Sequence, residues 1–178
     1  MKADTKTLNA PESRSETPSS AGYEPRGDYR GEATVERLPQ HTIYKPNSRG
    51  SGGVIRFGLN PYKEAMFVDA APQNGERQFD WEAKLTMKWG LSDLGAVLAV
   101  LQGRQSEAKL FHKSEKTGTN SAFELVHRTE EDRPPYLLVL SRQDADKALK
   151  KVMVPLTHAE AALLQVVLAR AVERLLGW

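Results

Sequence analysis

The 178-residue sequence contains no cysteine. This absence excludes a disulfide scaffold, a thiolate zinc site and a cysteine nucleophile, so nothing favours an oxidising compartment and we expect an intracellular protein. No apolar run approaches the ~20 residues of a membrane-spanning helix, so we expect no membrane segment. Net charge is also small, because 25 lysines and arginines face 23 aspartates and glutamates. A nucleic-acid partner must therefore be indicated by the arrangement of charges, since their total does not indicate one.

Signals of catalysis and of metal binding are equally sparse. The four histidines, at positions 41, 112, 127 and 158, lack the spacing of a helical zinc motif, and no Gly-x-Ser-x-Gly nucleophile elbow occurs. We therefore expect a protein that is not an enzyme, with no catalytic residue, no metal and no cofactor.

Composition divides the chain into two parts. Residues 1–41 mix Ser, Thr, Pro, Glu, Arg and Gly without helical or strand periodicity. Such a segment buries too little apolar surface to offset the entropy of ordering, which predicts a disordered polar tail. Residues 42–178 are richer in apolar side chains and are predicted to form one folded domain.

The first half of the predicted domain is typical of strands followed by a helix. Turn residues separate candidate strands at 54–59, 64–70 and 78–89. The third alternates strictly, which places Trp81 and Trp89 on a core-facing side and Lys84 and Lys88 on the opposite side. A short helix is then predicted, with Ser92 as its N-cap and an end near residue 103.

The second half repeats this order. Strands are predicted at 107–113, 122–128, 136–142 and 148–156, and their short connections require antiparallel pairing. Thr157 and Glu160 form a capping box that begins the closing helix. Its apolar stripe is too wide for one packing surface, which indicates an oligomer interface; burial in a larger monomeric core is the alternative. The predicted interface residues are Leu164, Val167, Leu168, Ala171 and Leu175.

Four spaced motifs resemble the Whirly superfamily. They are QFDW at 78–81, LFHK at 110–113, VPLTHAE at 154–160 and the closing GW at 177–178. The resemblance implies an α+β fold of two antiparallel sheets, each followed by a helix, in the order strands, helix, strands, helix. It also implies a tetramer whose sheets hold a single-stranded nucleic acid.

One departure bears on which branch the chain resembles. Plant members carry a Lys-Gly-Lys-Ala-Ala-Leu type of strand, and here residues 47–53, followed by 54–59, occupy its place. This difference and the polar tail favour similarity to the mitochondrial guide-RNA-binding proteins of kinetoplastid protozoa. That branch implies a mitochondrial matrix location, annealing of guide RNA with pre-mRNA during editing, and a homo-tetramer or a hetero-tetramer with a related subunit.

Cations on or beside the predicted strands are the candidate ligands for phosphates, and exposed rings are candidates for base stacking. Lys109 and Lys113 share a strand face with Phe111, as Lys84 shares one with Lys88. The full set of predicted nucleic-acid-binding residues is Lys45, Arg49, Arg56, Lys63, Lys84, Lys88, Lys109, Phe111, Lys113, Arg128, Arg142, Lys150 and Lys151.

Two other functions stay open. The same fold is compatible with single-stranded DNA in an organelle or nucleoid as the ligand. The nearly balanced charge is also compatible with a structural subunit whose sheets bind protein.

Overall fold

The computed structural model describes residues 38–115, 117–130 and 133–178. The tail that is predicted to be disordered covers residues 1–41, and its residues 1–37 lie outside the described residues. Strand β1 begins at Gln40, two residues before the predicted start of the domain at residue 42.

The first sheet is antiparallel and has five strands. Its strands are β1 (Gln40–Lys45), β2 (Gly53–Asn60), β3 (Ala65–Gly75), β4 (Gln78–Phe79) and β5 (Leu85–Trp89). A single 3-10 turn, η1 (Pro61–Lys63), joins β2 to β3. Strands β1, β2 and β3 are neighbours in that order, and both β4 and β5 pair with β3.

The prediction of one long strand at 78–89 is wrong, because a turn divides this segment into β4 and β5. The Asp80 carboxylate accepts a hydrogen bond from the backbone N–H of Ala83 at 3.0 Å, and this bond stabilises the turn. The pairing of β3 with β4 also shifts register between Gln73 and Gly75. Trp81 therefore leaves the strand alternation and lies partly exposed instead of in the core.

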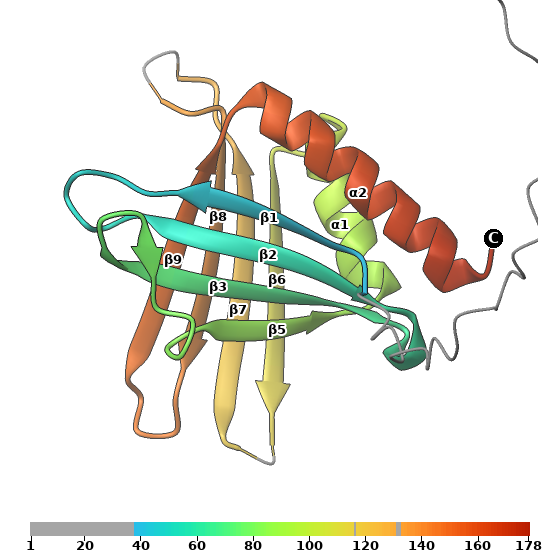
Figure 1. The fold of residues 1–178 in the computed structure, drawn as a ribbon. Helices are drawn as coiled ribbons and strands as arrows, with labels where there is room; N and C mark the ends of the chain where they lie inside the picture. Colours follow the sequence, from blue (N-terminus) through green and yellow to red (C-terminus); the bar gives the residue numbers. More distant parts are fainter. Residues whose placement is uncertain (1–37, 116, 131–132) are drawn as a thin grey trace, which may run out of the picture. The chain divides into compact units, whose positions relative to one another are not determined.

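The second sheet is also antiparallel and matches the expected strands closely. Its strands are β6 (Glu107–Ser114), β7 (Thr119–His127), β8 (Tyr136–Gln143) and β9 (Leu149–Leu156), paired in chain order. Figure 1 shows these strands crossing behind those of the first sheet. Each strand buries alternate side chains against the other sheet.

Trp89 lies at the centre of the core between the two sheets. Its indole is fully buried and packs edge-on against Phe123 at 4.6 Å between ring centres, with Phe57 at 5.9 Å on its own sheet. Such contacts add to the stabilisation from the buried area itself. The strand alternation had predicted this burial of Trp89.

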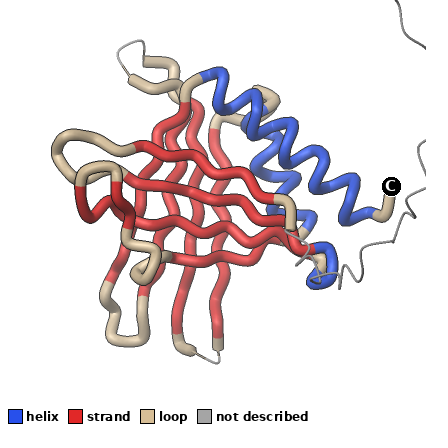
Figure 2. The backbone as a smooth tube through the Cα atoms, in the orientation of Figure 1, coloured by secondary structure: helices blue, strands red, loops and turns tan. Residues whose placement is uncertain are grey.

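One helix follows each sheet, as predicted, and Figure 2 shows the two helices lying beside each other. Helix α1 (Leu91–Leu101) has Gly90 as its N-cap in place of the expected Ser92, because the Asp93 carboxylate accepts the Gly90 N–H at 2.9 Å. Helix α2 (His158–Leu176) begins with the predicted capping box of Thr157 and Glu160.

Candidate nucleic-acid interface

The outer face of the four-stranded sheet gathers four of the predicted site residues. Lys109, Phe111 and Lys113 alternate along β6 with the buried Ala108 and Leu110. Across the sheet, Phe111 is in register with Ala122, Ser141 and then Lys151 on β9. Leu149 and Met153, both exposed, share this side of β9 with Lys151. We call this set the platform: Lys109, Phe111, Lys113, Leu149, Lys151 and Met153.

Small side chains on the central strands hollow out the platform. Ala122 and Ser141 occupy β7 and β8 between the larger Phe111 and Lys151, and they help to line a hollow of about 320 Å³. Phe111 beside this hollow is 66% exposed. A flat ring beside a shallow trough is a geometry that suits contact with the face of a base.

Lysine charges on the platform are not equivalent. Lys109 Nζ lies 2.9 Å from Glu107 Oε2 and 3.9 Å from Glu124 Oε1. The hydrogen bond that Lys109 donates to Glu107 raises the pKa of Lys109. Lys113 and Lys151 have no ion-pair partner among the residues that the structure describes. The net positive charge of this face therefore comes from Lys113 and Lys151.

The outer face of the five-stranded sheet holds a second group of cations around one acid. Asp69 Oδ2 accepts hydrogen bonds from Arg56 Nη2 at 2.5 Å and from Lys84 Nζ at 3.3 Å, and Oδ1 accepts one from the Thr86 hydroxyl at 2.6 Å. Burial alone raises the pKa of Asp69, but the bonds from Arg56 and Thr86 and the two positive charges lower it overall. The guanidinium of Arg56 also lies 4.7 Å from the centre of the Trp81 ring.

Two more of the predicted cations, Lys63 and Lys88, lie on this second face, and neither pairs with a carboxylate among the described residues. The ammonium of Lys63 is 5.5 Å from the centre of the Phe67 ring, within the range of a cation–π interaction. Lys88 is in register with Phe67 on the neighbouring strand. Neither lysine forms an ion pair within the described part of the chain.

Three predicted phosphate ligands are engaged in ion pairs elsewhere. Lys45 Nζ lies 2.6 Å from Glu160 Oε1 and so joins β1 to the capping box of α2. Arg142 and Lys150 both pair with Asp144, at 2.8 and 3.1 Å, and point to the side of the sheet opposite the platform. Their role as free phosphate ligands is not supported by this geometry. Arg49 lies in the β1–β2 loop and Arg128 directly follows β7, so neither is on a strand.

The predicted interface on α2 lies mostly inside the chain's own core. Leu164, Leu168 and Ala171 are buried beneath the helix, and Val167 and Leu175 are half-buried, because this side of α2 packs against its own subunit. The interface prediction is therefore wrong for Leu164, Leu168 and Ala171, whereas for Val167 and Leu175 it stays a prediction. The exposed apolar residues of the C-terminal helix and its end are Leu163, Val166, Leu176 and Trp178.

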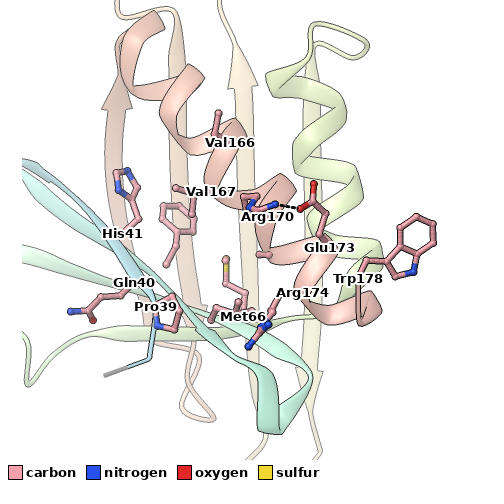
Figure 3. A pocket seen from close by; sticks show the side chains of 13 residues that line it. Pro39, Gln40, His41, Met66, Val166, Val167, Arg170, Glu173, Arg174 and Trp178 are labelled. Atoms are coloured by element: carbon pink, nitrogen blue, oxygen red, sulfur yellow. Dashed lines mark hydrogen bonds and ion pairs between the residues drawn. The ribbon is translucent and has the colours of Figure 1, made fainter. Parts of the chain in front are cut away.

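A groove runs beside this exposed side of α2. Its volume is about 590 Å³, and Figure 3 shows Val166, Val167 and Arg174 of the helix across from Pro39 and Met66. Arg170 donates a hydrogen bond to Glu173 at 2.5 Å on its rim. The groove is thus apolar at its base and charged at its edge.

Within the described residues, no three histidines or carboxylates come together in a way that suits a metal ion, and no helix is long and apolar enough to cross a bilayer.

A family model described as "Whirly transcription factor" matches residues 29–167. The chain belongs to the Whirly family. The resemblance read from the four sequence motifs is therefore confirmed.

Solved Whirly structures share the fold. The crystal structure of WHY1 from Arabidopsis thaliana superposes with a TM-score of 0.65 at 18% identity, over 79% of this chain and 86% of that one. A guide-RNA-binding protein complex bound to a guide RNA gives a TM-score of 0.58 at 17% identity, over 80% and 95%. The predicted fold class, two antiparallel sheets each followed by a helix, is confirmed.

Two curated Whirly relatives come from plants. The mitochondrial single-stranded DNA-binding protein WHY2 of Arabidopsis thaliana is 22% identical over 90% of this chain, and the chloroplastic single-stranded DNA-binding protein WHY1 of Solanum tuberosum is 25% identical over 84%. The chain spans 66% and 53% of the lengths of these relatives.

The prediction did not include Leu149 and Met153. The alternation of side chains along β9 could have found them, because they lie two residues before and after Lys151 and so share its face of the strand. Trp81 was missed for a different reason, because its position depends on the turn that ends β4.

Proposed function

We propose that this Whirly chain binds single-stranded RNA in a sequence-tolerant manner through the phosphate backbone, with the platform as the contact surface. The observation that carries the proposal is the exposed Phe111 beside a trough that Lys151 helps to line, with Lys113 on the same face of β6; neither lysine has an ion pair among the described residues. The family assignment supports it, because relatives with this fold are named for binding single-stranded nucleic acids.

The two kinds of platform residue have different tasks. Lys113 and Lys151 neutralise phosphates and release the counterions that these had condensed. Phe111, with Leu149 and Met153, offers apolar contact to base faces, which all four bases possess. Contacts of this kind hold a strand without depending on its sequence.

Annealing of complementary RNAs follows from the same contacts. Neutralising phosphates lowers the repulsion between two strands, so a coated strand pairs more readily. We propose that the pairing partners are a guide RNA and a pre-mRNA in the mitochondrial matrix. This rests on the resemblance to the kinetoplastid proteins and on the structural similarity to a guide-RNA complex.

Single-stranded DNA is the second candidate ligand, and the names of the two plant relatives favour it. The platform provides charge and stacking surfaces, which suit either polymer. Competition between RNA and DNA 20-mers of the same sequence distinguishes the two candidates.

We further propose that the functional unit is a tetramer, of this chain alone or with a related subunit. The exposed apolar side of α2, with Leu163, Val166, Leu176 and Trp178, supports an interface there.

The test is filter binding of 20-mer oligouridylate over a salt series. We expect log affinity to fall linearly with log salt concentration and mixed complementary RNAs to anneal faster with the protein present. Affinity that does not change with salt would contradict capture of the backbone. Absence of binding to either polymer would favour the third function, a structural subunit whose sheets bind protein.

A further inference from the structure

The second cationic face contains an arrangement that the proposed function does not use. Arg56 on β2 and Lys84 before β5 share one carboxylate, that of Asp69 on β3, and Trp81 lies against Arg56. We call these four residues the Asp69 cluster. Asp69 is buried, while the side chains of Arg56 and Lys84 remain 31% and 40% exposed.

In this cluster the edge of the Arg56 guanidinium contacts a carboxylate, and its face contacts an aromatic ring. One edge nitrogen donates to Asp69 at 2.5 Å, and the guanidinium carbon Cζ lies over the Trp81 ring, 4.7 Å from its centre. A guanidinium binds phosphate through its edge, whereas a base stacks on its face or on an aromatic ring. Because Asp69 engages one edge nitrogen, Arg56 has fewer edge donors for a phosphate, while its face and the Trp81 ring still offer surfaces for stacking.

Asp69 also changes the local charge. It offsets one of the two cations and places a negative charge directly beneath any phosphate that approaches them. By contrast, Lys113 and Lys151 on the platform have no such acid among the described residues. The two faces therefore differ in what they favour: a phosphate on the platform and a planar, uncharged group at the Asp69 cluster.

We propose that Trp81 and Arg56 form a stacking site for one nucleobase of a bound single strand, and that Asp69 is the positioning residue that makes this site accept a base in preference to a phosphate. The inference rests on the proposed function, because it assumes that a single strand is the ligand. It adds a base-binding site on the sheet opposite the platform, and it includes Trp81, which the sequence pattern had placed in the core.

The first test replaces Trp81 with Ala in the full chain and measures binding of two 20-mers, oligouridylate and an abasic strand with the same number of phosphates. Because stacking contributes about 1–3 kcal/mol per base, we expect affinity for oligouridylate to fall about 5- to 150-fold. Affinity for the abasic strand and the salt slope should not change, since no cation is lost. Trp81→Phe keeps a flat ring and should retain most of the preference for oligouridylate.

Asp69→Asn tests the positioning role, and Asp144→Asn is its matched control. Asp144 also pairs with two cations, Arg142 and Lys150, but neither of them lies over an aromatic ring in the described structure. Both variants remove the same charge. Releasing Arg56 and Lys84 should steepen the salt slope by about 0.7 per phosphate gained and reduce the preference for oligouridylate over the abasic strand. Asp144→Asn should leave that preference unchanged.

Two results would overturn the inference. One is an unchanged preference for oligouridylate in the Trp81→Ala variant, with melting confirming that the variant is folded. The other is an equal change of preference in Asp69→Asn and Asp144→Asn, which would mean that net charge alone acts. In either case salt-dependent binding by the wild type would leave the proposed function standing, whereas failure of the wild type to bind either 20-mer would remove both.

Discussion

Lys113 and Lys151 are expected to supply most of the electrostatic part of binding at the platform. The perturbation is the double replacement Lys113→Ala with Lys151→Ala. Both side chains are exposed at the surface of the platform and lack an ion pair in the part of the chain that the structure describes, so their loss should leave the core intact. The two residues lie on strands at opposite edges of the four-stranded sheet.

The size of the effect follows from counting phosphates. Each phosphate contact on a single strand contributes about 0.7 to the slope of log affinity against log salt. If each lysine holds one phosphate, the double variant loses about 1.4 from the slope. Over a fourfold rise in salt, from ~50 to ~200 mM, the wild type should lose about sevenfold more affinity than the variant does.

Lys150→Ala, compared with the single variant Lys151→Ala, is the matched control. Lys150 is the neighbour of Lys151 on β9 and has the same charge, but it points away from the platform and pairs with Asp144 at 3.1 Å. Filter binding of 20-mer oligouridylate at several salt concentrations measures all slopes. Equal slopes for the Lys150 and Lys151 variants would refute the reasoning, because net charge would then matter and position would not.

Three further predictions concern stability and assembly. Trp89→Ala should lower the free energy of unfolding by about 3–5 kcal/mol, because the indole is fully buried; chemical denaturation measures it, and a loss below about 1 kcal/mol would contradict its central place. Burial raises the pKa of Glu160, but bonds from Lys45 and Thr157 lower it overall, so its stabilisation holds above the unfolded pKa of about 4.3 and is lost as the pH falls through the lower folded value. Denaturation of wild type and Glu160→Gln from pH 7 to 3 should show their difference shrinking, and a constant difference would contradict this. Val166→Glu, at a position 61% exposed, should reduce particle mass in sedimentation without unfolding the chain, and an unchanged mass would place the interface elsewhere.

Features that depend on neighbouring residues were predictable from the sequence. The alternation along 107–113 placed Lys109, Phe111 and Lys113 on one face, and the spacing of Thr157 and Glu160 fixed the start of α2. Both patterns act within a few residues. The resemblance to the Whirly family then supplied the grouping of the strands into two sheets, which local patterns alone do not specify.

Features that depend on residues far apart in the chain were not predictable. The Asp69 cluster requires the register in which Arg56, Asp69 and Thr86 lie side by side on three strands. Similarly, periodicity showed a wide apolar stripe on α2 but not which part of it faces the chain's own sheets. Leu164 and Leu168 were therefore assigned to a subunit interface, whereas Leu163 and Val166 are the residues that remain exposed.

The pairing of charges bears directly on annealing. A protein that brings two strands together must also leave the duplex, so very tight binding would slow turnover. Arg56, Lys84, Arg142 and Lys150 are all held by acids, and on the platform only Lys113 and Lys151 have no ion pair within the described residues. Each phosphate contact adds to affinity and to its salt dependence, so few contacts mean a moderate hold on each strand. Stacking on Phe111 requires an unpaired base and is lost when that base enters a duplex. The platform is therefore expected to bind single strands more tightly than the product, which favours release after pairing.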